Sequence, residues 1–283
     1  LDKIFNKIPK SECNIILPGD SHHGKSIVAN SIGISMASLT NENKHCSVLY
    51  WALDDSFQAI SLRSMSIIGK IDKELIGGLR RPTTDDEIKA LKYARETLSS
   101  LISEQRFVVK DTYDIDSLQL ASQWIQKTQD KTGNDVIMIV DALNDLPIDG
   151  DDFSHIEQSM DWINYLTNIL RCCVIATTHN RKRNAPGEPS LSDLKGNNKT
   201  VYVGKIIMSI YNQMQEVGPD NATIGWVKNG KRQPIICANV MKNKTFFGGK
   251  GKSYFKLHED SISIEEVPES DIFLPKSTGT PSN

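Results

Sequence analysis

The sequence predicts an α/β fold with a mostly parallel, twisted sheet, helices on both faces of that sheet and additional C-terminal strands. Three observations support this prediction. Short apolar runs alternate with longer amphipathic runs over the first 180 residues, several apolar runs end at polar or acidic residues, and a glycine-rich segment joins the first strand to the first helix. Strands of a parallel sheet are buried on both faces, so their sequences are continuously apolar, as these runs are.

Five apolar runs are predicted to form the parallel strands, and amphipathic segments between them are predicted to form helices. The strands are expected at 13–19, 47–53, 106–111, 136–146 and 172–180, and helices at 26–39, 85–102, 114–133 and 153–171. Asp85 and Asp86 suit the start of their helix because a helix N-terminus favours negative charge. Asp116 is expected to cap the next helix, and Gly133 to end it.

The chain changes character after residue 180. Residues 181–200 are basic, rich in Gly, Pro and Asn, and without apolar periodicity, which predicts a long functional loop. Further strands are expected in VGKIIMSIY, TIGWVK, PIICANVMK and SYFKLH. Residues 1–267 are expected to form one domain and 268–283 a flexible tail.

The composition of the chain limits which partners the protein can bind and in which cellular compartment it is expected. The net charge is −2, so a nucleic-acid surface must be a local patch and not a general positive field. The five cysteines have no CxxC spacing, which favours buried free thiols in a reducing compartment. No apolar run reaches the length of a membrane span and no signal peptide opens the chain, so we expect a cytoplasmic protein with no membrane partner.

The segment PGDSHHGKSIVAN fits the phosphate-binding pattern GxxxxGK[ST], with Gly24, Lys25 and Ser26 at its end. Its glycines let backbone N–H groups surround phosphate oxygens, Lys25 is expected to reach the β- and γ-phosphates, and Ser26 to bind Mg²⁺. The alternative is a glycine-rich turn, but a strand before the segment and a helix after it favour the phosphate site. The expected nucleotide contacts are Gly19, Asp20, Ser21, His22, His23, Gly24, Lys25, Ser26 and Ile27.

Three polar positions at the ends of other strands are expected to complete this site. Asp141 ends the run VIMIV and is expected to hold the metal with Ser26, the alternative being a solvated acid. Asp54 is expected to position or activate water, although Asp55 or Ser56 at the same place can instead cap a helix. His179 is expected to sense the γ-phosphate, whereas a lone histidine is more often structural.

Four further stretches resemble the RecA-like ATPase domain of the DnaB-type hexameric replicative helicases, over about residues 1 to 267. VLYWALDDSFQAISLRSMS resembles the family's strand ending in Ser-Leu-Glu and its following helix with an arginine, here Arg63. VIMIVDALNDL resembles the Walker B segment, and IATTHNRKRN with PSLSDLKGN resembles the stretch with Gln-Leu-Asn-Arg and Ser-Asp-Leu-Arg. ANVMKNKTFFGG resembles the late strand with Lys-x-Arg.

The resemblance implies a P-loop ATPase that uses ATP and Mg²⁺ to move along single-stranded DNA. It implies a homo-oligomer, a hexameric ring, in which Lys242 and Lys244 reach the nucleotide of the neighbouring subunit and Arg63 contacts the nucleotide. Primase or a helicase loader are implied partners, and a phage or a mobile element is an implied source. The segment from Ser192 to Asn197 and residues 147–153 are implied to form loops beside the DNA. Together with the local basic residues, the expected DNA contacts are Arg181, Arg183, Lys195, Gly196, Asn197 and Lys199. The basic residues of this segment can also contact phosphates without reading bases, or form a solvated loop.

Three positions differ from the family pattern: Asp54 replaces a glutamate, His179 a glutamine and Lys244 an arginine. An aspartate is one methylene shorter, and a lysine lacks the bidentate fork of an arginine. Two alternatives therefore remain beside the helicase: a RecA-like or KaiC-like recombinase-type ATPase, and a nucleotide-gated DNA-binding or assembly protein with weak hydrolysis. A packaging motor of the same superfamily is a further alternative.

Overall fold

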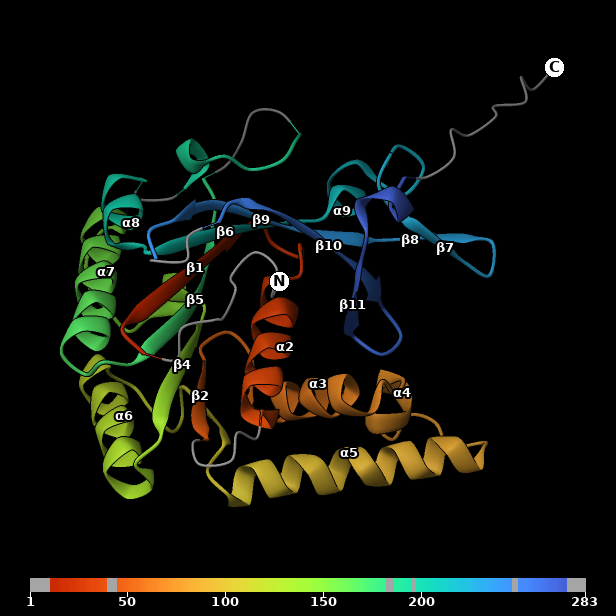
Figure 1. Ribbon diagram of the computed structural model, residues 1–283, viewed down its shortest axis with the longest axis horizontal. Helices are drawn as coiled ribbons and strands as arrows, with labels where there is room; N and C mark the ends of the chain where they lie inside the picture. The colour runs from red at the N-terminus through yellow and green to blue at the C-terminus, as the bar shows by residue number, and fades with distance from the viewer. Residues whose placement is uncertain (1–10, 40–44, 182–185, 195–196, 246–248, 274–283) are drawn as a thin grey trace.

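A central sheet with helices on both faces makes up most of the molecule (Figure 1). The computed structural model describes residues 11–39, 45–181, 186–194, 197–245 and 249–273. The strands are β1 (Cys13–Gly19), β2 (Cys46–Ala52), β3 (Phe107–Asp111), β4 (Asp135–Asp141), β5 (Cys173–His179), β6 (Ile206–Tyr211), β7 (Trp226–Lys228), β8 (Lys231–Gln233), β9 (Ile235–Asn243), β10 (Gly251–His258) and β11 (Ser263–Val267).

The sheet is parallel in one part and antiparallel in the other. Within the described ranges, nine strands pair in the order β11-β10-β9-β6-β1-β5-β4-β2-β3, and β7 pairs with β8 in a separate hairpin. The strands from β6 to β3 run parallel, and β9, β10 and β11 add antiparallel pairs at the other end. The predicted α/β class, with a mostly parallel sheet and additional C-terminal strands, is confirmed.

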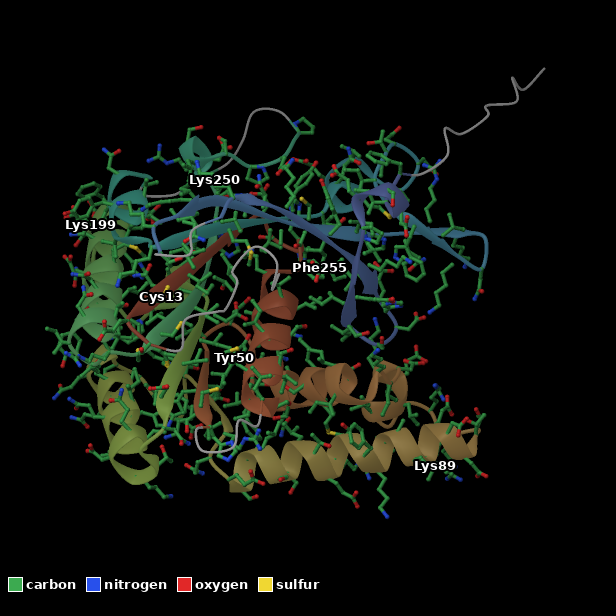
Figure 2. All side chains as sticks on the ribbon, viewed as in Figure 1. Cys13, Tyr50, Lys89, Lys199, Lys250 and Phe255 are labelled. Carbon is green, nitrogen blue, oxygen red and sulfur yellow. The ribbon has the colours of Figure 1, made fainter. Side chains whose placement is uncertain are left out.

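The helices cover both faces of the sheet, as predicted. α2, α3 and α5 pack on one face over Leu17, Val48 and Tyr50, and α6, α7 and α8 pack on the other over Ile16 and Trp51. All five cysteines are buried and free, and Figure 2 shows the side chains on the ribbon, with Cys13 and Tyr50 labelled. The helices are α2 (Lys25–Ser38), α3 (Phe57–Gly69), α4 (Lys73–Ile76), α5 (Asp85–Ser103), α6 (Leu118–Thr132), α7 (Asp152–Asn168), α8 (Asn197–Val203) and α9 (Gln213–Val217), with 3₁₀ turns η1 (Leu143–Asp145), η2 (Leu191–Asp193) and η3 (Glu269–Asp271).

The start of α6 and the end of β4 differ from the expectation. The cap of α6 is Ser117 and not Asp116, because the Ser117 hydroxyl accepts a hydrogen bond from the Leu120 N–H at 3.3 Å and Asp116 lies one residue too early. Gly133 does end α6, with a φ of 65°. The strand expected at 136–146 stops at Asp141, where the chain turns into η1.

The C-terminal end of the described chain packs against the sheet. Ile272 is fully buried beside β9 and β10, and its carbonyl accepts a hydrogen bond from the Gly225 N–H at 2.8 Å. The prediction of a flexible tail is therefore wrong for residues 268–273. The rest of the expected tail, residues 274–283, lies outside the described residues. No helix of the described chain is long and apolar enough to cross a membrane.

Candidate nucleotide site

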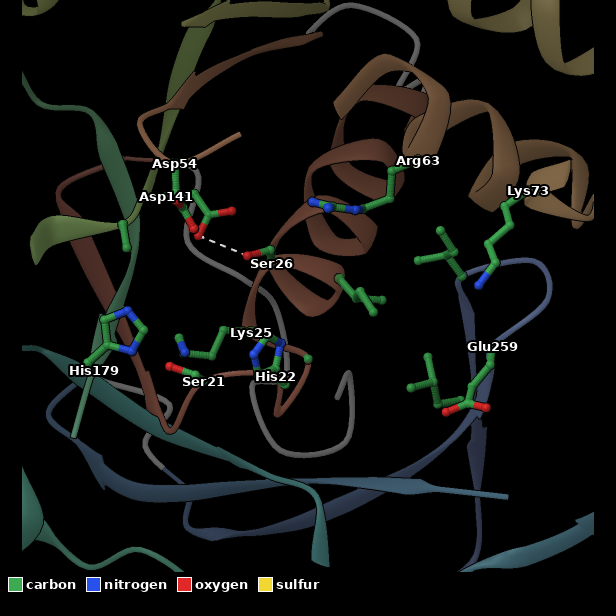
Figure 3. A pocket seen from close by; sticks show the side chains of 15 residues that line it. Ser21, His22, Lys25, Ser26, Asp54, Arg63, Lys73, Asp141, His179 and Glu259 are labelled. Atoms are coloured by element: carbon green, nitrogen blue, oxygen red, sulfur yellow. Dashed lines mark hydrogen bonds between the residues drawn. The ribbon is translucent and has the colours of Figure 1, made fainter. Parts of the chain in front are cut away.

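The carboxyl ends of four neighbouring parallel strands meet at one edge of the sheet. The register pairs Gly19 of β1 with His179 of β5, and Ala52 of β2 with Asp141 of β4. A cleft of about 690 Å³ opens at this edge (Figure 3), the usual position for a ligand in an open α/β sheet. It brings together most of the predicted nucleotide residues: Ser21, His22, Gly24, Lys25, Ser26, Ile27, Asp54, Arg63, Asp141 and His179.

Two glycines let the loop between β1 and α2 lie close against the sheet. A Cβ at Gly19 would meet the carbonyl oxygen of Ile210 at 2.6 Å, which leaves no room for a side chain. Gly24 has a φ of 92°, and a Cβ there would meet Cδ1 of Ile236 at 2.6 Å. Both glycines of the motif are thus required by the geometry of this loop.

Lys25 begins α2 and lies buried at the floor of the cleft. Its ammonium donates a hydrogen bond to the carbonyl oxygen of Asp20 at 2.9 Å, across the loop. Burial lowers the pKa of Lys25 below its ordinary value, while the carboxylates around it, Asp141 foremost, oppose that shift. The site therefore holds a cation whose desolvated charge favours an anionic ligand.

The Asp141 carboxylate is fixed by three hydroxyl groups from three different elements. Oδ1 accepts hydrogen bonds from Ser26 Oγ at 3.1 Å and Thr177 Oγ1 at 2.5 Å, and Oδ2 accepts one from Tyr50 Oη at 2.5 Å. Burial and the Asp141 charge raise the pKa of Tyr50 well above its ordinary value, so the phenol stays protonated and donates. The carboxylate is thereby held in one orientation beside Ser26.

The sequence analysis missed Tyr50 and Thr177 because both lie inside apolar strands that predict only core packing. A hydroxyl side chain within an apolar run could have indicated them, because a buried hydroxyl group needs a hydrogen-bond partner. Thr177 and Tyr50 find that partner in the acid of β4, which lies near them only once β2, β4 and β5 have paired.

Asp54 and His179 lie at the same end of the cleft (Figure 3). Asn144 anchors the end of β5, because its Oδ1 accepts hydrogen bonds from the His179 N–H at 2.9 Å and Thr178 Oγ1 at 3.2 Å. Burial raises the pKa of Asp145 above its ordinary value, and the Asp54 charge adds to the shift while His179 opposes it. Two carboxylates and an imidazole thus interact at the end of the cleft where Asp141 lies.

Arg63 of α3 lines the cleft and forms an ion pair with Asp55, which was one of the two residues considered as the cap of this helix. Its Nη1 lies 3.0 Å from Asp55 Oδ2. Ser56 is the actual cap of α3, because its hydroxyl accepts a hydrogen bond from the Ala59 N–H at 3.2 Å. Asp54 therefore does not cap the helix and lines the cleft, as predicted.

The other end of the cleft is built by residues that the sequence analysis did not single out. Lys73 of α4 and Glu259 after β10 lie there, opposite the acidic end (Figure 3). Leu257 and Ile262 also line the cleft. The turn after β10 is tied to α4, since the Lys73 N–H donates to the Asp260 carbonyl at 2.7 Å. These elements come from distant parts of the sequence, so no local pattern predicts their meeting.

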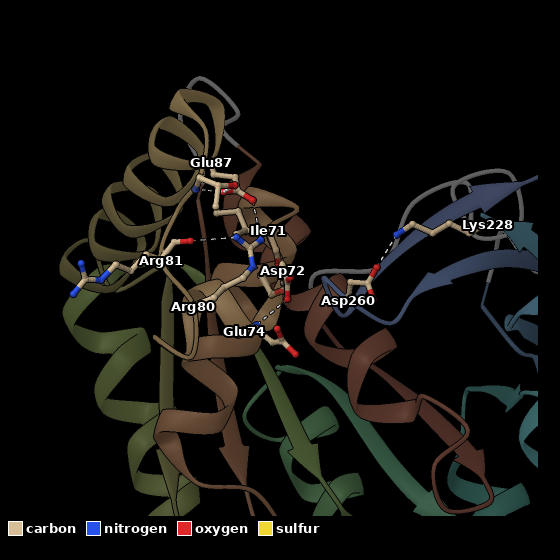
Figure 4. A network of polar contacts seen from close by, with 10 residues as sticks. Ile71, Asp72, Glu74, Arg80, Arg81, Glu87, Lys228 and Asp260 are labelled. Atoms are coloured by element: carbon tan, nitrogen blue, oxygen red, sulfur yellow. Dashed lines mark hydrogen bonds and ion pairs between the residues drawn. The ribbon is translucent and has the colours of Figure 1, made fainter. Parts of the chain in front are cut away.

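Ion pairs hold this end of the cleft in place (Figure 4). Arg80 lies 3.2 Å from Asp72, the cap of α4, and 2.8 Å from Glu87 of α5. Asp260 pairs with Lys228 of β7 at 2.7 Å. The hydrogen bond from Arg80 lowers the pKa of Glu87 to about 2, so Glu87 stays charged at neutral pH.

Two predicted nucleotide residues support the loop and do not line the cleft. The His23 ring is buried edge-on to Tyr211, with the ring centres 5.6 Å apart, and its Nδ1 accepts a hydrogen bond from the Asn212 N–H at 3.4 Å. Asp20 Oδ1 accepts a hydrogen bond from Asn180 Nδ2 at 3.1 Å, which ties the loop to the end of β5. Their side chains therefore position the loop, whose backbone N–H groups are the predicted phosphate contacts.

The segment expected to bind DNA starts at the end of β5 and returns to it. Asn180 forms a bridge with Leu194, and the Arg181 N–H donates to the Asp193 carbonyl at 2.7 Å. Arg181 is exposed. Arg183, Lys195 and Gly196 lie outside the described residues, and Asn197 is the first residue of α8. α7 begins at Asp152, so the companion segment expected at 147–153 is partly helical.

The three remaining lysines of the prediction lie away from the cleft. Lys199 pairs with Asp161 of α7 at 2.7 Å, and the exposed Lys244 has its Nζ 5.8 Å from the centre of the Tyr202 ring. Lys242 is buried and donates to the carbonyl oxygens of Val201 and Gly204 at the end of α8. Lys242 thus stabilises its own chain, whereas the resemblance implied contact with another subunit.

Comparison with known proteins assigns the chain to a family. Residues 1–249 match the DnaB-like helicase C terminal domain family, and the chain belongs to that family. A comparison with curated proteins finds no match. The predicted RecA-like helicase-type fold is confirmed by this match and by the similar structures described next.

Two solved structures show how far the likeness extends. A DnaB-like replicative helicase, described with its interactions with primase, is 18% identical with a TM-score of 0.73, and the match covers 91% of this chain and 58% of that one. A separately solved ATPase domain is 18% identical with a TM-score of 0.76, and that match covers 94% of this chain and 88% of the domain. The chain thus spans about three fifths of the length of the replicative helicase.

Proposed function

We propose that this chain is the ATP-hydrolysing motor domain of a ring-shaped helicase that moves along single-stranded DNA during replication. The single observation that carries the proposal is the hydrogen bond from Ser26 to Asp141, 3.1 Å long, beside the Lys25 ammonium in one cleft. A strand-end acid next to a P-loop hydroxyl is the arrangement that P-loop enzymes use for a nucleoside triphosphate with Mg²⁺. Family membership and the similar ATPase domain support the same proposal.

The donor set in the cleft fits Mg²⁺. Magnesium is usually held by one or two carboxylates together with substrate phosphates and water. Ser26 and Asp141 supply one hydroxyl and one carboxylate, and three hydroxyl donors hold Asp141 in one orientation. Bound there, Mg²⁺ would neutralise charge on the β- and γ-phosphates.

The other cleft residues would bind the phosphates and position the attacking water. Lys25, which now donates to the Asp20 carbonyl, would donate to the β- and γ-phosphate oxygens. Asp54 lines the cleft and would orient the attacking water and accept its proton. Its neighbours Asp145 and His179 would tune the charge around that water.

A short path connects this chemistry to the segment that we assign to DNA. Asn180 links the P-loop residue Asp20 to the end of β5, and it also bridges to Leu194. Arg181 lies between these two contacts. A displacement of His179 by the γ-phosphate would therefore move Asn180, Arg181 and Leu194. A basic segment in this place would contact the DNA backbone without reading the bases.

Steady-state ATP hydrolysis with and without single-stranded DNA tests the proposal. The wild-type chain should turn over ATP faster with DNA, and Lys25→Ala should lower turnover by about 100-fold or more, because a phosphate-stabilising cation is lost. Lys89→Ala removes an exposed lysine on α5 and is the matched control, expected to behave as wild type. ATP binding without turnover above the Lys25→Ala background would reject the motor and favour a nucleotide-gated assembly protein.

A further inference from the structure

The nucleotide cleft continues beyond its phosphate and metal residues. In Figure 3, Asp141 marks one end of the cleft, Lys73 and Glu259 mark the opposite end, and the P-loop residue Lys25 lies between them. The γ-phosphate of a bound nucleotide is assigned to the Asp141 end, beside the metal position. The sugar and the base would therefore extend toward Lys73 and Glu259.

Lys73 and Glu259 carry opposite charges, and both side chains are exposed. In the part of the chain that the structure describes, neither side chain forms a hydrogen bond or an ion pair, although both line the same cleft. The Glu259 carboxylate offers two acceptor oxygens, and the Lys73 ammonium offers three N–H donors. A ligand at this end of the cleft can therefore use both groups.

The turn from β10 to β11, which carries Glu259, is held against α3 and α4. The Lys73 N–H donates to the carbonyl oxygen of Asp260, the residue after Glu259, at 2.7 Å. Ser66 of α3 donates its hydroxyl to the carbonyl oxygen of Ser261 in the same turn. These bonds join the backbones that carry Lys73 and Glu259, so the two side chains start from fixed positions before a ligand binds.

The β10–β11 hairpin also brings apolar side chains to the cleft. Leu257 and Ile262, which lie on either side of Glu259 in the hairpin, line the cleft together with Ile27 of α2. Ligand pockets commonly combine apolar walls with a few polar groups that fix the orientation of the ligand. A nucleobase has flat apolar faces and a polar edge, so it fits a cleft of this composition.

A carboxylate at the edge of a nucleobase discriminates between guanine and adenine. The pairing edge of guanine carries two adjacent donors, N1–H and the N2 amino group, with the acceptor O6 beside them. A carboxylate can accept both hydrogen bonds, and an ammonium can donate to O6. The pairing edge of adenine carries one amino group, and the lone pair of the adjacent N1 would repel a carboxylate. The pair of Lys73 and Glu259 therefore matches guanine better than adenine.

We propose that Glu259 and Lys73 bind the base of the nucleotide and make the cleft selective for guanine over adenine. Glu259 accepts hydrogen bonds from N1–H and the N2 amino group, and Lys73 donates one to O6. This inference rests on the proposed function, which places the phosphates at Lys25 and Ser26. The preferred substrate is then GTP, and ATP binds more weakly, because a site that hydrogen-bonds to a group rejects an analogue that lacks it.

Binding of the Mg²⁺ complexes of GTP, inosine triphosphate and ATP, measured by titration calorimetry, tests this inference. GTP should bind about tenfold more tightly than ATP, since the two-donor contact exists only with guanine. Inosine triphosphate should fall between them, because its base keeps N1–H and lacks the amino group. Glu259→Gln should bring the ratio of the GTP and ATP affinities to about one, because an amide offers one acceptor and one donor group. Lys73→Ala should weaken GTP more than ATP, because adenine has no acceptor at the O6 position.

Glu96→Gln removes an exposed carboxylate on α5 and is the matched control, expected to keep the wild-type ratio. Equal affinities for GTP and ATP in the wild-type chain would overturn the inference, and so would a preference for guanine that survives in Glu259→Gln. Equal affinities for both bases, with weaker binding of the 2′-deoxy nucleotides, would place Glu259 on the ribose instead. The expected preference without nucleotide turnover would reject the motor and support the base contact, whereas a chain that binds none of these nucleotides would reject both.

Discussion

Asp141 is the residue on which the cleft depends most. A carboxylate has about four lone-pair positions, and three of those of Asp141 accept hydroxyl hydrogen bonds. The bonds to Tyr50 and Thr177 are inside the sheet, whereas the bond to Ser26 is at the cleft. Two residues of the sheet thus hold the carboxylate in place, and its remaining lone-pair position is left for a ligand in the cleft.

Tyr50→Phe tests this support for Asp141. The variant removes one donor from a buried carboxylate, so we expect the free energy of unfolding to fall by about 1.5–3 kcal/mol, measured by urea denaturation. Tyr93→Phe removes an exposed hydroxyl of the same kind on α5 and should change nothing. Equal stability of the Tyr50→Phe and wild-type chains would show that the Tyr50 bond does not hold the acid.

Sequence reasoning found the part of the site that is encoded locally. Lys25 and Ser26 follow from the spacing of one short motif, and Asp54 and Asp141 follow from acids at the ends of apolar runs. Tyr50 and Thr177 do not, because their partner is distant in sequence and reaches them only through strand pairing. Lys242 was expected to contact the nucleotide of another subunit. Its actual partners, the carbonyls at the end of α8, are also distant in sequence, so no local pattern predicts this contact.

At the scale of elements, continuous apolar runs identified five of the parallel strands, β1 to β5. The short strands β8 and β11 were missed, because three to five residues with polar positions give little periodic signal. Because the C-terminal segment also has little periodic signal, the predicted end of the folded domain, residue 267, was too early. Ile272 shows that η3 belongs to the packed structure, beside Tyr254 of β10.

Ile272→Ala tests the packing of the C-terminal segment. Removing a fully buried isoleucine side chain should lower the free energy of unfolding by about 2–5 kcal/mol, because a cavity replaces apolar contacts. Phe273→Ala is the neighbouring control, since that side chain is 64% exposed and its loss should cost about 0.5 kcal/mol or less. Thermal unfolding that shifts equally in both variants would contradict the packing described for Ile272.

At the scale of the whole molecule, the sheet separates the nucleotide cleft from a second cavity of about 470 Å³, which is lined by Lys199, Lys205 and Lys244. The cleft lies at the carboxyl edge of the parallel strands, and the second cavity lies near the amino end of β6. Sequence alone could not join Lys199 to Lys244, because the strands from β6 to β9 lie between them along the chain.

Equilibrium binding of ATP, measured by titration calorimetry with and without Mg²⁺, shows directly whether the cleft holds a magnesium nucleotide. We expect saturable binding that Mg²⁺ strengthens in the wild-type chain and an affinity about 10- to 100-fold weaker in Lys25→Ala, since a charged hydrogen bond is lost. Asp141→Asn should abolish most of the Mg²⁺ effect, and Lys89→Ala should bind as wild type. The same affinity in Lys25→Ala and wild type, or a Mg²⁺ effect unchanged in Asp141→Asn, would contradict the assignment of this cleft to a magnesium nucleotide.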